Sequence, residues 1–316
     1  MKKFWKISLG LLSSVAVPLS ALSCNNSHIS YNKPFAQTIN HNLKLLTETY
    51  FDNNQNELKD FYRTQSQIGN SLIPEYRTSL IFAPLWDQKV LKNADSNTKQ
   101  TIQSIKNIEQ ALTNEWFWYL NNLEKLQFVF NPYGNEYSGN ASAGNNIFNK
   151  FLESDKPLSI TLKDSNIQKI YIKDFQLSKY DELKNKKMYF MQIDTNKFLM
   201  LLTYQDQNDK KQIFLLPDLY VISNNISVDA FSSKLIEMIQ EVNQAQIQKE
   251  IDYLKNFDDP INEEAVSKQF NDVAFIKLFS SKNYAQLLSL VIQKMQNDEN
   301  NKVSFEKYTW GFVNEK

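Results

Sequence analysis

Few residues of this chain could act as nucleophiles, general bases or soft metal ligands. The sequence contains one cysteine, Cys24, and two histidines, His28 and His41. A catalytic triad or a zinc site needs several such groups at suitable spacing, and no nucleophile-elbow, phosphate-loop or calcium-loop sequence accompanies them. His28 lies in a short polar stretch, and His41 lies beside the apolar face of a predicted helix. We therefore predict no catalytic residue, no metal site and no cofactor, and a protein that is not an enzyme.

Paired carboxylates are the remaining candidates for acid–base chemistry. Asp258-Asp259 and Glu263-Glu264 occur at predicted helix boundaries. Acidic side chains there interact favourably with the positive end of the following helix dipole. Glycosidase chemistry would instead need two acids facing each other across a cleft. We favour the helix-boundary role.

The charge balance excludes one class of partner. Lysine plus arginine and aspartate plus glutamate number 35 each, so the formal net charge is zero. A neutral chain has no overall attraction for nucleic acid. Asparagine is abundant and arginine is limited to Arg63 and Arg77. We interpret both features as the codon bias of an AT-rich genome.

The first residues have the organisation of an export signal. Lys2, Lys3 and Lys6 precede an apolar segment, Ile7 to Val17, and Ala21-Leu22-Ser23 leads into Cys24. The apolar segment is too short to span a bilayer, which needs about 20 residues. This arrangement is typical of a signal peptide.

A lone cysteine in this position resembles a bacterial lipoprotein signal. The resemblance implies that the signal peptide, residues 1–23, is removed and that the Cys24 thiol carries a diacylglyceryl group. Two acyl chains give stable membrane anchoring. The alternative is an ordinary secretory signal with an incidental cysteine. We interpret residues 24–33 as a tether and predict a body, 34–316, held on the extracellular face of the cell membrane.

Hydrophobic periodicity divides the body into helical, β and helical parts. Helices are predicted from Pro34 to Tyr50 and over 58–68, 102–125, 231–254, 262–279 and 282–296. Residues 158–222 contain short β-type runs, with turns at 194–196 and 206–209 and a central strand at 198–202. The segment 305–313 is either a strand or loose. We predict a single α+β domain in which helical N- and C-terminal parts pack around a central antiparallel meander.

The most unusual segment is NEWFWYLNNLEKLQFVFNPYG, residues 114–134. We expect the end of a long helix, then a strand from Leu126 that Asn131-Pro132 terminates, then an exposed glycine-rich loop over 131–146. The rings could form a core, a ligand platform or a partner surface. Because a helix that is apolar nearly all round is buried, we favour the core. The aromatic residues are Trp116, Phe117, Trp118, Tyr119, Phe128, Phe130 and Tyr133.

This motif, together with the lipoprotein signal, resembles the aromatic-cluster surface lipoprotein family of mycoplasmas. The resemblance implies a membrane-anchored surface protein and no catalytic role. The residues that correspond to motif positions are Trp116, Trp118, Phe128, Phe130, Asn131 and Pro132.

Two functions are compatible with these features. The first is a non-enzymatic surface lipoprotein that acts as an interaction or structural module, with a host or bacterial surface protein or glycan as partner. The second is a small-solute or glycan binding protein that uses its aromatic residues.

Overall fold

The computed structural model describes most of the predicted body. Cys24, the signal peptide, the tether, Pro132, Tyr133 and the rest of the predicted 131–146 loop beyond Asn131 lie outside the described residues. The described residues are 39–68, 96–131, 153–164, 166–223, 226–257, 260–278, 280, 282–298, 303 and 305–313.

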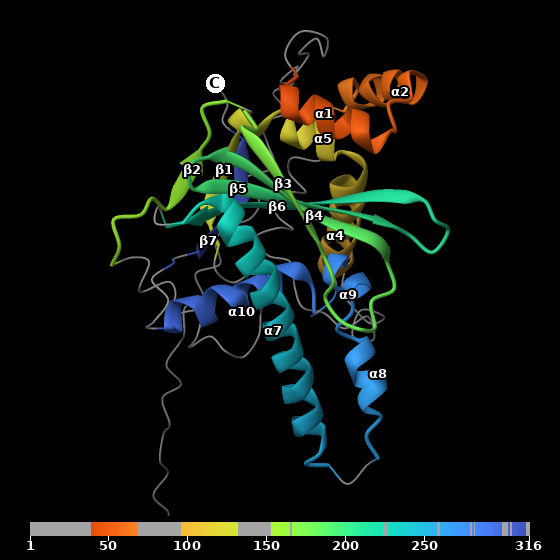
Figure 1. The fold of residues 1–316 in the computed structure, drawn as a ribbon, viewed down its shortest axis with the longest axis vertical. Helices are drawn as coiled ribbons and strands as arrows, with labels where there is room; N and C mark the ends of the chain where they lie inside the picture. Colours follow the sequence, from red (N-terminus) through yellow and green to blue (C-terminus); the bar gives the residue numbers. More distant parts are fainter. Residues whose placement is uncertain are drawn as a thin grey trace, which may run out of the picture.

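The described strands form one antiparallel sheet of seven, in the order β2-β1-β7-β6-β5-β4-β3 (Figure 1). The α+β prediction is confirmed, and β3 to β6 form the predicted meander. The strands are β1 (Leu126–Phe130), β2 (Ser159–Thr161), β3 (Lys169–Asp174), β4 (Lys184–Asp194), β5 (Lys197–Gln205), β6 (Lys211–Ile222) and β7 (Phe305–Val313).

Two strands lie where the local pattern did not place them. The short strand β2 was predicted at the start of the meander, but it pairs with β1 at the opposite edge of the sheet. The segment 305–313 is a strand, and it lies between β1 and β6. Both placements depend on pairing between segments far apart in the chain, which a local pattern does not encode.

Short turns and register shifts set the pairing of the meander, and one of these shifts lies at Pro217. Thr195 and Asn196 join β4 to β5, and Asp209 adopts φ 58° in the turn between β5 and β6. The two predicted β runs on either side of Pro217 form one strand, β6. Its register against β5 shifts there, because Leu199 faces Leu219 whereas Met200 faces Leu216. A bulge accommodates the proline, which cannot donate to the ladder.

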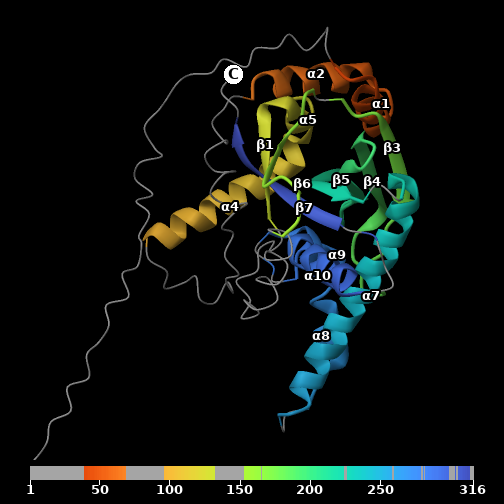
Figure 2. The ribbon, with the colours of Figure 1, turned by 90° about the vertical axis from the view of Figure 1, so that its left-hand side faces the viewer.

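Helices cover both faces of the sheet (Figure 2). The helices α1, α2 and α5 lie on one side, and α9 and α10 lie on the other. No helix in the described ranges is long and apolar enough to cross a membrane. The α-helices are α1 (His41–Tyr50), α2 (Gln55–Ser66), α4 (Ser96–Asn114), α5 (Trp116–Leu120), α7 (Val228–Leu254), α8 (Glu263–Lys268), α9 (Asp272–Ile276) and α10 (Tyr284–Asn297).

Asparagine side chains begin most of these helices. Asn40 accepts hydrogen bonds from the backbone N–H groups of Asn42 and Leu43, and Asn54 does the same at α2. Each such bond satisfies a donor that the first turn of a helix leaves free. The same role is filled at α8, α9 and α10 by Asn262, Asn271 and Asn283.

Two predicted helices are broken. The predicted helix over 102–125 ends at Asn114, since Glu115 leaves the helical conformation at φ −117°, and α5 follows as a separate turn before a 3₁₀ helix, Leu123–Lys125. The predicted helix over 262–279 consists of α8 and α9, separated at the cap residue Asn271. The helical spacing of apolar residues continues through both breaks. Periodicity alone therefore predicted one helix in place of α4 and α5, and one in place of α8 and α9.

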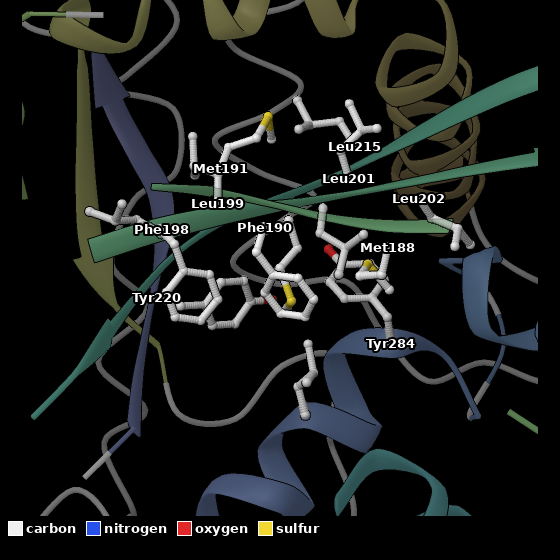
Figure 3. Close-up of a cluster of buried hydrophobic side chains, with 14 of the residues drawn as sticks. Met188, Phe190, Met191, Phe198, Leu199, Leu201, Leu202, Leu215, Tyr220 and Tyr284 are labelled. Atoms are coloured by element: carbon white, nitrogen blue, oxygen red, sulfur yellow. The ribbon is translucent and has the colours of Figure 1, made fainter. Parts of the chain in front are cut away.

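The main core lies on both faces of the sheet, which explains the continuous apolar run in β5. Phe198 and Phe190 point toward α10, where Tyr284 joins them, whereas Leu199 and Leu201 point to the other face (Figure 3). The Phe198 ring stacks on Tyr220 with centroids 5.5 Å apart. A sheet covered by helices on both sides needs apolar residues at successive positions.

A buried ionic cluster joins the β3–β4 connection to α9. The Lys186 Nζ lies 2.6 Å from Asp181 Oδ2 and 2.6 Å from Asp272 Oδ2, and all three side chains are at most 7% exposed. Asp272 also accepts the backbone N–H groups of Glu182 and Leu183 at 2.9 and 3.0 Å. The chain before β4 is thereby fixed to the first turn of α9.

Replacing Lys186 by methionine should destabilise the fold, because two buried carboxylates lose their counter-charge. We expect a loss of about 3–5 kcal/mol in the free energy of unfolding, measured by urea titration. Lys184→Met is the matched control, since Lys184 pairs with Asp209 at the surface, and it should cost at most ~1 kcal/mol. Equal effects of the two substitutions would contradict the assignment of the Lys186 cluster as a structural clamp.

Candidate functional site

The helix α5 contains the densest part of the aromatic motif, and it has no solvent-facing side. Its residues Trp116, Phe117, Trp118, Tyr119 and Leu120 are each at most 6% exposed. The helix contacts α1, α2, α4 and β6. It is therefore enclosed by other elements.

Rings from α1 and α2 pack over α5 in a group that we call the ring layer. Trp116 stacks on Phe61 with centroids 5.5 Å apart, and Phe117 lies 5.1 Å from Tyr62. Such offset and edge-on pairs contribute about 0.5–1.5 kcal/mol beyond area burial. The two α5 rings are buried, while the others are half-buried and form the outer edge. The ring layer comprises Tyr50, Phe51, Phe61, Tyr62, Trp116 and Phe117.

One buried side-chain amide, that of Gln65, hydrogen-bonds the backbone groups left without partners where α4 ends and α5 begins. Gln65 of α2 is 1% exposed. Its Nε2 donates to the carbonyl of Asn114 at 2.8 Å, and its Oε1 accepts the backbone N–H of Trp118 at 3.0 Å. These are a terminal acceptor of α4 and a first-turn donor of α5, which have no partner within their own helices. Gln65 therefore allows the chain to turn at Glu115 inside an apolar environment.

Two further hydrogen bonds fix the orientation of α5. The Tyr119 hydroxyl donates to the carbonyl of Pro217 at 2.7 Å, which connects α5 to the bulge of β6. Asn122 Nδ2 donates to the carbonyl of Trp118 at 2.6 Å. Both polar groups are thus satisfied inside the protein.

The second half of the motif lies on β1. Phe128 is fully buried and Phe130 is 9% exposed, with its ring 5.7 Å from that of Tyr308. Asn131 follows the strand, and its backbone N–H donates to the carbonyl of Lys307 at 2.9 Å. The motif therefore contacts β7 directly.

A chain of polar side chains crosses the sheet from Asn131. Asn131 Nδ2 donates to Thr309 Oγ1 at 2.9 Å, and Thr309 Oγ1 donates to Asp218 Oδ1 at 2.5 Å. The other carboxylate oxygen of Asp218 accepts from the Tyr220 hydroxyl at 3.3 Å. Asp218 and Lys307 are each 1% exposed. The strands β1, β7 and β6 are thus joined by side chains as well as by backbone.

Burial governs the ionisation of this polar chain. Loss of water raises the pKa of the Asp218 carboxyl, which the Lys307 charge and the two hydroxyl groups oppose less strongly. Desolvation likewise lowers the pKa of the Lys307 ammonium, and the Asp218 charge opposes it. Both shifts favour the neutral form of each group.

Four polar residues of this site were not predicted from the sequence: Gln65, Asp218, Lys307 and Thr309. Asp218 could have been noticed, because it is the one charged residue in the apolar run IFLLPDLYVI. Gln65 gave no signal, since its role depends on a helix break in another segment. Of the motif residues, Trp116 to Tyr119, Phe128 and Phe130 all belong to the main buried core, and Asn131 joins the polar chain.

The sequence matches the model of one protein family. Residues 25–253 match the model of the aromatic cluster surface protein family, which is 229 of the 316 residues. The chain belongs to this family. No curated protein and no solved structure matches it.

The aromatic cluster surface protein assignment extends the resemblance beyond the motif. The matched region includes both halves of the motif, the β3–β6 meander and nearly all of α7, whereas β7 and α8 to α10 lie outside it. Surface location agrees with the family's description, and the mycoplasma origin stays a prediction. Within the described ranges, no group of three or more histidine, cysteine, aspartate or glutamate side chains is placed to hold a metal ion.

Replacing Gln65 by alanine should leave the Asn114 carbonyl and the Trp118 N–H without partners. We expect the free energy of unfolding to fall by about 2–4 kcal/mol, measured by urea titration. Gln67→Ala is the control, because Gln67 is exposed at the end of α2, and it should change stability by less than ~0.5 kcal/mol. A Gln65 variant as stable as the control would show that the hydrogen bonds of Gln65 do not stabilise the turn between α4 and α5.

The buried carboxyl predicts a pH dependence. In the folded protein the pKa of Asp218 lies above its ordinary value of 3.8, so the folded chain holds this proton more tightly than the unfolded chain. The resulting contribution to the free energy of unfolding is fully present below pH 3.8 and is lost as pH rises through the folded pKa. Asp218→Asn should therefore gain stability relative to the unsubstituted protein as pH rises from about 4 to 7. Urea unfolding at several pH values measures this difference.

Asp206→Asn is the control with the opposite sign. Backbone hydrogen bonding from Lys210 lowers the pKa of the half-buried Asp206 carboxyl, so its contribution to the free energy of unfolding is lost as pH falls. The Asp206 variant should lose stability relative to the unsubstituted protein as pH rises through the acidic range to about 5, with little further change above it. The same slope for both variants would contradict the shift at Asp218.

Proposed function

We propose that the protein is a surface lipoprotein, anchored in the cell membrane through a diacylglyceryl group on Cys24. Its folded part lies on the extracellular face and acts as a non-enzymatic interaction or structural module. The observation that carries the anchor is the lone cysteine directly after the predicted signal peptide. Membership of a family described as surface proteins supports the location.

The geometry of the motif favours a module over a solute-binding protein. A ring that stacks on a sugar or a small solute must offer one free face. The rings of α5 and β1 are at most 9% exposed, and the hydrogen bonds of Gln65, Tyr119 and Asn122 hold α5 in place. Opening the α5 rings to a ligand would require α1 and α2 to move away from α5. The described rings of the motif thus serve stability, and recognition of a host or bacterial surface partner belongs to another part of the body.

The anchor is tested by labelling growing cells with a radioactive fatty acid. The unsubstituted chain should carry label in the membrane fraction. Cys24→Ala should carry none, because no other cysteine is present in the chain. Asn26→Ala is the matched control and should be labelled normally. An unlabelled unsubstituted chain, or a labelled Cys24 variant, would contradict the proposal.

A further inference from the structure

The ionic cluster between β4 and α9 places an amine in direct contact with two carboxylates inside the protein. The Lys186 Nζ lies 2.6 Å from Asp181 Oδ2 and 2.6 Å from Asp272 Oδ2. The side chains of Lys186 and Asp181 are each 7% exposed, and that of Asp272 is fully buried. We call these three residues the buried triad. An amine and a carboxyl group held together away from water are the reactants of an amide bond.

The buried triad holds two carboxylates and one amine. In the ranges that the structure describes, Lys186 is the one cation paired with either carboxylate. Hydration of the separate ions opposes amide formation in water, and burial has already removed that hydration. An amide between Lys186 and Asp272 would replace two buried charges by a neutral group. Asp181 would keep the backbone N–H groups of Leu177 at 2.7 Å and Ser178 at 3.1 Å as hydrogen-bond donors.

The Asp272 carboxyl group is positioned for attack by Lys186. Its Oδ1 accepts the backbone N–H of Glu182 at 2.9 Å, and its Oδ2 accepts that of Leu183 at 3.0 Å. Donors placed in this way stabilise the negative charge that develops on oxygen when a nitrogen attacks the carboxyl carbon. A nitrogen at hydrogen-bond distance from a carboxyl oxygen lies roughly 3–3.5 Å from that carbon, which is a near-attack arrangement.

We propose that Lys186 and Asp272 become joined by an amide bond between their side chains, with Asp181 as the proton carrier. Asp181 takes a proton from the Lys186 Nζ, which then attacks the Asp272 Cγ. The new N–C bond replaces one C–O bond. The released oxygen leaves as water with two protons from the ammonium group, and Asp181 ends as it began. Amine, carboxyl group and proton carrier all belong to the buried triad, so no oxidant or further reactant is needed.

The bond would tie β4 to α9 across 86 residues of chain. The sequence contains one cysteine, so a disulfide between two of its own residues cannot supply such a link. The pair of Lys156 with the buried Glu306 offers a contrast, because Lys156 is 39% exposed and no second carboxylate in the described ranges pairs with it. That pair should remain ionic. The destabilisation expected of Lys186→Met follows from loss of either the ion pair or the bond, so the test must detect the bond itself.

Mass spectrometry of tryptic peptides from the full chain detects the bond, since trypsin does not cleave after a lysine whose Nζ is acylated. Residues 269–277 should be recovered joined to residues 185–187. The joined peptide should be lighter by one water molecule than the sum of its two parts. Peptides that contain Lys156 and Glu306 should be recovered separately.

Two substitutions separate the roles within the buried triad. Lys186→Arg keeps the positive charge, but its guanidinium stays protonated, so residues 269–277 should be released as a free peptide. Asp181→Asn cannot take up the proton, so joined peptide should accumulate about a hundredfold more slowly after cell-free synthesis. Lys187→Arg is the matched control, because Lys187 pairs with Asp174 at the surface, and it should join normally. Thermal unfolding monitored by circular dichroism checks that each variant is folded.

Three results would overturn the proposal. The folded unsubstituted chain could release residues 269–277 only as a free peptide. The Lys186→Arg variant could give the joined peptide, which would place the link at another residue. The Asp181→Asn variant could join as fast as the unsubstituted chain, which would remove Asp181 from the reaction. A loss of fatty-acid label at Cys24 leaves these peptides unchanged, so failure of the anchor is distinguished from failure of the bond.

Discussion

Backbone pairing of β7 with two strands holds the two parts of this protein together. On one side it pairs with β1, which carries Phe128 and Phe130 and continues into Asn131. On the other side it pairs with β6, which leads into the meander. Without these two ladders the sheet would consist of β1 with β2 and, separately, β3 to β6. The β1 half of the aromatic motif belongs to the first part, so β7 connects it to the meander, whereas α5 contacts β6 directly.

The side chains of β7 make that connection specific. Glu306 is 3% exposed and pairs with Lys156, and Thr309 bridges Asn131 and Asp218. Buried polar groups without partners are costly, and a slip of one residue would turn each of these groups to the wrong face. An apolar strand would bind in several registers with similar energy. The polar chain therefore selects one register at a cost in desolvation.

Much of the architecture could be predicted from periodicity, because the strands of the meander and the helix α7 are long and regular. Strand alternation from Leu126 to Phe130 likewise predicted β1. The short elements could not be predicted in this way: α5 was joined to α4, and β2 was placed in the meander. Their positions depend on a single amide, Gln65, and on pairing with a distant strand. Of the candidate site, the apolar rings were identified from composition, whereas the polar residues that support them gave little local signal.

The abundance of asparagine also has a structural side that composition did not reveal. We interpret its frequency as codon bias, and five of the described helices use it as a cap. Asparagine is among the best residues for that position. A high asparagine content can therefore contribute to stability where the residue caps the N-terminus of a helix.

The place of β7 has a consequence for synthesis and transport. A chain that emerges from its N-terminus first presents the facing edges of β1 and β6 before residues 305–313 arrive to fill the space between them. Unfilled edges can recruit strands from neighbouring molecules, and non-local pairing is slow. At high local concentration, pairing of these edges with neighbouring molecules would compete with the insertion of β7 between β1 and β6. The longer residues 305–313 take to arrive, the longer these two edges stay unpaired.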